Sequence, residues 1–176
     1  MWYPGGEDDA AGEAFWRFSL ALYARPGVAH ALVAIQDRAA RDVNLILFGL
    51  WLGASQGRLL TAGELAGAAA AIAPIAGAGV APLRRQRRQL KGHADPDLAT
   101  LRLRLAGLEI AAERLVQFRL AAQLPGMSGA EPEADRLGAA QANLALYLGG
   151  EARSPEAGVL RQAVASLIHR AEPSEH

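Results

Sequence analysis

The most continuous apolar pattern in the chain runs from Val43 to Gly53 and reads VNLILFGLWLG. Apolar side chains occupy every side of a helix drawn through this stretch, so such a helix has no face suited to water. Asp42 stands directly before it, where a carboxylate can accept the free N–H groups of a first helical turn. Ser55-Gln56-Gly57 follows and ends the helix. The pattern predicts a buried helix over residues 42–53 at the centre of the fold.

The rest of the chain shows apolar residues at spacings of three and four, which is typical of amphipathic helices. Thr61 and Glu64 form a capping-box pattern at the start of one of these helices. Pro74 and the run Gly77-Ala78-Gly79 are expected to end that same helix. No alternating strand pattern is present. We expect helices over 13–24, 26–39, 42–53, 61–74, 83–91, 96–123, 133–148 and 154–169.

The predicted fold class is therefore all-α, with a single-domain bundle of seven to eight helices packed around the central apolar helix. The chain has 176 residues, which is an ordinary size for one domain. Residues 13–170 are expected to form this domain. Residues 1–12 and 171–176 are expected to be flexible tails, and 127–132 a loop containing glycine and proline.

The longest predicted helix carries apolar residues in a heptad pattern. Further apolar residues, Leu103 and Ile110, flank this seam, so the helix offers more apolar surface than one packing contact uses. The seam predicts a homodimer or a helical protein partner. In a monomer, two neighbouring helices could cover both faces instead. The seam consists of Leu98, Leu101, Leu105, Leu108, Ala112 and Leu115.

Composition narrows the function classes. Eighteen basic and eighteen acidic residues cancel, so the whole chain has no general attraction to nucleic acid or anionic membranes. Cysteine is absent, which excludes disulfides, thiolate metal ligands and cysteine nucleophiles. Residues 65–83 are uncharged, but they are mostly alanine and glycine and contain Pro74 and Pro82. We therefore expect no membrane span, and a cytoplasmic location.

A basic segment follows this uncharged stretch, with five cations within eight residues. Clustered guanidinium groups can bind an anion or an acidic protein partner. The alternative is a solvated helix face whose arginines pair with acids of the same chain, such as Asp95 or Asp97. No aromatic residue interleaves the cations to stack on bases, so no nucleic acid is expected. The cations are Arg84, Arg85, Arg87, Arg88 and Lys91.

Two further groups are candidate sites. Glu109 and Glu113 are four residues apart on one helix face and loosely resemble the acidic pairs that hold Mg²⁺ in isoprenoid synthases, but a second acidic cluster is missing. Asn44 is a polar residue in an apolar helix, so it caps the helix, forms a hydrogen bond across the core or contacts a ligand. The candidates for the core or a pocket are Asp42, Asn44, Phe48 and Trp51. No catalytic motif or cofactor-binding loop is present, so we expect no cofactor.

Several short segments together resemble a family of uncharacterised proteobacterial proteins of about this length. That family is known only as a domain of unknown function, and the resemblance covers residues 13–120. It implies no activity and assigns no functional residue. The segments are 15–23, 25–28, 36–37, 42–48, 82–84 and 90–92.

We therefore expect a non-enzymatic, cytoplasmic helical protein that acts as an interaction or scaffold protein and self-associates or binds a protein partner. The alternative is a small enzyme or carrier with an apolar pocket between its helices for a lipid or isoprenoid-like ligand.

Overall fold

The computed structural model describes residues 7–124 and 135–171, and within them every regular element is helical. A π-helical turn (η1, Ala76–Val80) joins α4 to α5, and a short 3₁₀ segment (η3, Gly149–Arg153) joins α7 to α8. The predicted all-α fold class is confirmed. The α-helices of the described residues are α1 (Glu7–Tyr23), α2 (Val28–Ala39), α3 (Val43–Gln56), α4 (Ala62–Ile75), α5 (Ala81–Gln89), α6 (Pro96–Ala121), α7 (Arg136–Leu148) and α8 (Pro155–Ala171).

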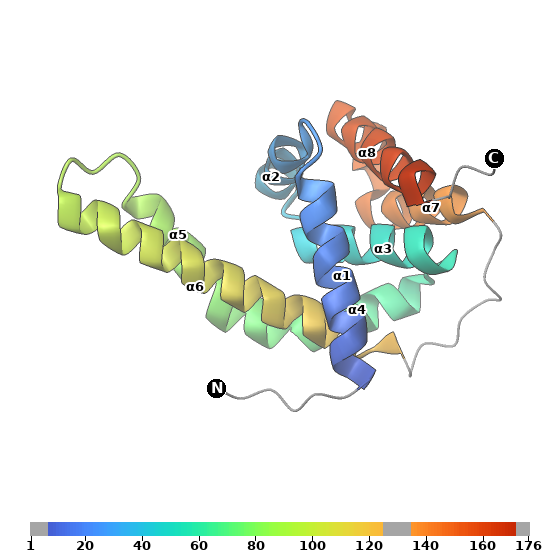
Figure 1. Ribbon diagram of the computed structural model, residues 1–176, viewed down its shortest axis with the longest axis horizontal. Coiled ribbons are helices and arrows are strands. Elements are labelled where there is room, and N and C mark those ends of the chain that lie inside the picture. Colours follow the sequence, from blue (N-terminus) through green and yellow to red (C-terminus); the bar gives the residue numbers. More distant parts are fainter. Residues whose placement is uncertain (1–6, 125–134, 172–176) are drawn as a thin grey trace.

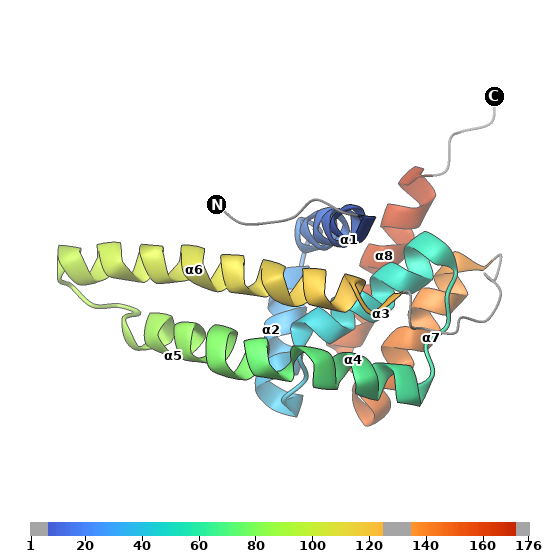
Figure 2. The same ribbon diagram turned by 90° about the horizontal axis from the view of Figure 1, so that it is seen from below.

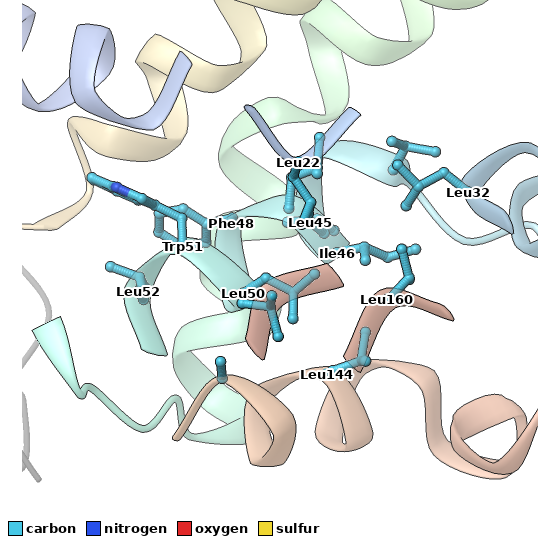
Figure 3. Close-up of a cluster of buried hydrophobic side chains, with 14 of the residues drawn as sticks. Leu22, Leu32, Leu45, Ile46, Phe48, Leu50, Trp51, Leu52, Leu144 and Leu160 are labelled. Atoms are coloured by element: carbon cyan, nitrogen blue, oxygen red, sulfur yellow. The ribbon is translucent and has the colours of Figure 1, made fainter. Parts of the chain in front are cut away.

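Helix α3 is the predicted central helix, and each of its residues from Val43 to Ala54 is buried. Asp42 caps it, because its carboxylate accepts a hydrogen bond from the backbone N–H of Asn44 at 2.8 Å. At its other end, Gly57 adopts the left-handed conformation with φ 64°, a conformation that glycine adopts without steric cost. Figure 3 shows side chains from α1, α2, α7 and α8 around those of α3. The prediction of a buried central helix is confirmed.

The contact between α3 and α7 depends on a small residue. A Cβ atom at Gly53 would collide with the backbone of Ala140, so glycine is what permits the two helices to approach this closely. On the other side of α3, Trp51 is buried and its ring stacks on that of Phe15 from α1, with 4.9 Å between the ring centroids. Phe48 lies beside both rings. These large aromatic side chains fill the space between α1 and α3.

Helices α4, η1 and α5 form one continuous helix of 28 residues, Ala62–Gln89. It runs antiparallel to α6 (Figure 2), and α5 with the N-terminal half of α6 projects from the body as a two-helix arm (Figure 1). The prediction that Pro74 and the following glycines end a helix was wrong. A π-helical turn follows the proline, where the N–H of Ala81 donates to the carbonyl of Ala76. Such a turn lets the helix continue past a local break in its hydrogen bonds.

Helix boundaries agree with the pattern at most other positions. The capping box of Thr61 and Glu64 is present, and Ser154 caps α8 by accepting from the N–H of Ala157 at 3.2 Å. Helix α1 begins at Glu7, inside the segment predicted to be a tail and six residues before the predicted start at residue 13. The predicted loop 127–132, the predicted start of a helix at 133, and residues 1–6 and 172–176 lie outside the described residues.

Length and composition make Ala62–Gln89 a helix that could cross a membrane, although core helices of soluble proteins pass the same test. Only 17% of its most apolar stretch is buried. Helices α1 and α2 pass the same test only as a pair, bent by 101°. The exposed residues of α4 and η1 are glycine, alanine and proline, so the surface there carries only small, uncharged side chains.

Candidate functional site

The basic segment and the pair of glutamates lie face to face where α5 packs against α6. Arg84 forms an ion pair with Glu109, with 2.9 Å from its Nε to Oε1, and a second with Glu113, with 2.6 Å from Nη2 to Oε1. Arg87 also donates to Glu109 from two of its nitrogens. Residues three or four apart share a face of a helix, so the antiparallel pairing of α5 with α6 brings both arginines onto Glu109 and brings Arg84 onto Glu113 as well.

The predicted partners of these arginines, Asp95 and Asp97, were wrong. Asp95 is the N-cap of α6, and its carboxylate accepts from the N–H of Asp97 at 2.8 Å. Arg88 instead pairs with Asp37 of α2 at 3.1 Å. Backbone N–H groups at a helix start compete for a capping carboxylate, whereas α6 and α2 present free carboxylates to α5.

The five predicted cations therefore divide into two groups. Arg84, Arg87 and Arg88 hold α5 against α6 and α2. Arg85 and Lys91 are exposed and form no ion pair with any residue that the structure describes. A contact of this helix with an anion or a protein partner would therefore involve Arg85 and Lys91 more readily than the paired arginines.

The two glutamates differ in their electrostatic environment. Burial alone raises the pKa of Glu109, but hydrogen bonds from Arg87 and Arg84 outweigh it, so the pKa of Glu109 lies below its ordinary value. For Glu113, burial outweighs the attraction of Arg84, and the pKa of Glu113 is raised. The two glutamates, which were weak candidates for metal ligands, are thus paired with guanidinium groups. No group of three or more histidines or carboxylates that could hold a metal ion occurs among the described residues.

Asn44 forms a hydrogen bond across the core, which was one of its predicted roles, but its partners Gln117 and Ser19 were not predicted. Ser19 Oγ donates to Gln117 Oε1 at 3.0 Å, and Gln117 Nε2 donates to Asn44 Oδ1 at 3.1 Å. This buried chain of polar side chains links α1, α6 and α3 across the core. The sequence feature that could have indicated this chain is Gln117, a polar residue between the apolar Val116 and Leu120, both of which are buried in the structure. Of the other core or pocket candidates, Asp42 caps α3, while Phe48 and Trp51 are core residues.

Two adjoining pockets open beside this polar chain, where the arm meets the body. The first, which we name the apolar pocket, has a volume of about 260 Å³ and lies between α1, α3 and α6. The second, the basic pocket, has a volume of about 280 Å³ and lies between the arm and helices α1 and α2. The apolar pocket is lined by Trp16, Leu20 and Leu47, the basic pocket by Arg84, Arg87, Arg88 and Arg102, and both by Tyr23, Val43, Ile110 and Glu113.

The leucine seam of α6 is divided between the inside and the outside of the molecule. Leu98, Leu105 and Ala112 are partly buried, whereas Leu101, Leu108 and Leu115 are 46, 56 and 43% exposed. We name the latter three the outer seam. Leu103, at 69%, and Ile110, at 53%, are also exposed, but helix geometry places them on the far side of α6 from the outer seam.

The chain is an all-α protein with a buried central helix and a two-helix arm in which ion pairs join α5 to α6. A family model described as "Protein of unknown function (DUF2390)" matches residues 14–120, and the chain belongs to this family. The match extends from α1 nearly to the end of α6, so it includes the arm and the residues of both pockets. No curated protein and no solved structure matches the chain.

Proposed function

We propose that this protein is a non-enzymatic helical scaffold that forms a homodimer through the outer seam of α6. The observation that carries the proposal is that three leucines, spaced seven residues apart, are exposed along α6, whose N-terminal half projects from the body in the arm. Exposed apolar patches of this kind mark interaction surfaces more often than single apolar residues do.

The seam is complementary to itself when two copies run antiparallel about a two-fold axis at Leu108. Leu101 and Leu115 each lie seven residues from Leu108, so Leu101 of one copy would face Leu115 of the other. Asp97 and Arg119 each lie eleven residues from Leu108, so opposite charges would also meet. At 3.6 residues per turn, all five residues fall within a sector of about 40°. A two-fold interface requires this kind of matching.

The charges at the two ends of the seam are available for such pairing. Asp97 and Arg119 are exposed, and neither side chain forms an ion pair within the part of the chain that the structure describes. In an antiparallel dimer the two bodies would lie at opposite ends, because each arm projects from its own body (Figure 1). The arms could then lie side by side without a collision of the bodies.

We also propose a cytoplasmic setting in a bacterium, in keeping with the resemblance to uncharacterised proteobacterial proteins. The long helix Ala62–Gln89 pairs along its length with α6 (Figure 2), and α6 carries ionic residues throughout. A hairpin spanning a membrane would carry those charges into the bilayer, where each is costly. This argues against a membrane span formed by the helix Ala62–Gln89.

Sedimentation velocity of the full chain at tens of micromolar tests the dimer. Each leucine buried contributes about 1.5–3 kcal/mol, so Leu108→Glu, which places two charges at the axis, should convert a dimer to a monomer. Leu103→Glu, a matched change on the far side of the same helix, should leave the dimer intact.

The charged ends give a stricter test. Asp97→Arg and Arg119→Asp should each weaken the dimer, and the double variant should restore it, because the two charges exchange places across the axis. A wild-type chain that sediments as a monomer contradicts the proposal. So does a dimer that Leu108→Glu does not weaken, or a double variant weaker than both single variants.

A further inference from the structure

We propose that the apolar pocket and the basic pocket together form one binding site for a small amphipathic anion. The anionic group would bind at Arg102 in the basic pocket, and the apolar chain would occupy the apolar pocket. This inference does not depend on dimer formation, because the outer seam contributes no residue that lines either pocket.

The charges around the basic pocket favour an anion. Four arginines line it against two glutamates. Arg84 and Arg87 neutralise the glutamates, and Arg88 pairs with Asp37. Arg102 has no ion pair within the described residues, and its Nε is buried without a hydrogen-bond partner. Arg102 also lines the pocket, and a guanidinium group without an acidic partner binds a carboxylate or phosphate through charge-assisted hydrogen bonds.

The chain of the ligand is inferred from the adjoining pocket. Tyr23, Val43 and Ile110 line both pockets, so the two pockets adjoin at these side chains, and a ligand that occupies both would pass along them. On the side of the apolar pocket, Trp16 and Leu47 provide apolar surface. At the polar end of the apolar pocket, Asn44 Oδ1 already accepts a hydrogen bond from Gln117 Nε2 at 3.1 Å, and Gln117 Oε1 accepts one from Ser19 Oγ at 3.0 Å. An uncharged chain therefore suits this pocket better than a second polar group does.

The first experiment measures which chemical class binds. The full-length wild-type chain is titrated calorimetrically with octyl phosphate, octanoate, octanol and inorganic phosphate. The two amphipathic anions are kept below their critical micelle concentrations, and octanol below its solubility limit. We expect at least one of the two amphipathic anions to bind, and octanol and inorganic phosphate to bind at least about tenfold more weakly, since each lacks one half of the recognised ligand. If octyl phosphate binds more tightly than octanoate, the site prefers a phosphate group. The reverse order of affinities shows that it prefers a carboxylate group.

The second experiment tests the assigned residues. Arg102→Gln should weaken binding of the amphipathic anion about tenfold or more and leave octanol unchanged. Leu20→Asn, at an exposed residue of the apolar pocket, should weaken binding of the anion but not that of inorganic phosphate. Arg104→Gln is the matched control, because Arg104 is an exposed arginine of α6 that lines neither pocket, and it should bind like the wild type.

Circular dichroism melting shows whether each variant is folded. If Arg102→Gln does not fold, Arg102→Lys takes its place; it keeps the charge but loses the planar fork, and should also weaken binding. The proposal is overturned if neither anion binds, if inorganic phosphate binds as tightly as octyl phosphate, or if the folded Arg102 variant binds like the wild type.

Discussion

Replacing Glu109 by glutamine should destabilise the protein strongly, because this one carboxylate pairs with both Arg84 and Arg87. The Glu109 side chain is 7% exposed, and those of Arg84 and Arg87 are 20 and 27% exposed. Removing one partner of a buried ion pair typically costs about 3–5 kcal/mol, because a charge is left without compensation. The two arginines keep some contact with water, so we expect a loss near the lower end, about 3 kcal/mol.

Two matched variants each remove one carboxylate that pairs with an arginine of α5. Glu113→Gln should cost less than about 1 kcal/mol, because burial already disfavours the ionised form of Glu113 and raises its pKa. Asp37→Asn breaks a pair whose side chains are 49 and 52% exposed, and exposed pairs contribute about 0–1 kcal/mol. The three variants share the same change in net charge, so differences among them report the local environment.

The dependence on pH separates the two glutamates further. The folded-state pKa of Glu109 is below its ordinary value of 4.5, so its stabilising contribution is fully present above pH 4.5 and is lost as the pH falls through the folded pKa. The folded-state pKa of Glu113 is raised above 4.5, so its contribution is fully present below pH 4.5 and is lost as the pH rises through the folded pKa. The wild type should therefore gain stability relative to Glu113→Gln in mild acid.

Equilibrium urea unfolding, followed by circular dichroism at neutral pH and in mild acid, measures these free energies. The ranking Glu109→Gln, then Glu113→Gln and Asp37→Asn, follows from burial and pairing alone. If Glu109→Gln costs no more than Asp37→Asn at neutral pH, the ion pairs of the arm contribute no more than surface pairs, and the reasoning is refuted.

Two further predictions follow from the core and the basic helix. Trp51→Ala should cost about 3–5 kcal/mol in urea unfolding and Asp42→Ala about 1 kcal/mol, since only a cap is lost; equal small effects would show that α3 is not the centre of the core. The basic helix should not bind DNA or RNA tightly at about 0.15 M salt, because phosphate contacts weaken steeply with salt and no aromatic residue adds stacking. Fluorescence anisotropy measures this, and a sub-micromolar affinity would contradict it.

The sequence alone determined the helices and caps that depend on contacts between residues close together in the chain. The buried helix α3 could be predicted because its apolar residues are contiguous and Asp42 precedes them. The capping box of Thr61 and the cap of α8 could be predicted for the same reason, since capping is a contact between near neighbours in the chain. The heptad spacing of α6 likewise showed that apolar surface would run along one side of that helix.

Contacts between helices required the tertiary structure. The sequence predicted that Arg84 and Arg87 could pair with acids, but the pairing with Glu109 follows from the antiparallel packing of α5 on α6, 22 to 25 residues apart in the chain. The continuity of the helix past Pro74 depends on a π-helical turn, which helix propensity does not encode.

The outer seam and the two pockets also depend on how the helices pack against one another. The apolar spacing of α6 could not show that Leu105 would be partly buried while Leu108 stayed exposed, since that depends on which helices cover α6. The hydrogen bonds from Ser19 through Gln117 to Asn44 join residues 98 and 73 positions apart. Side chains at such separations meet only through packing, and this packing also forms the two pockets in which Arg102 and Leu20 lie.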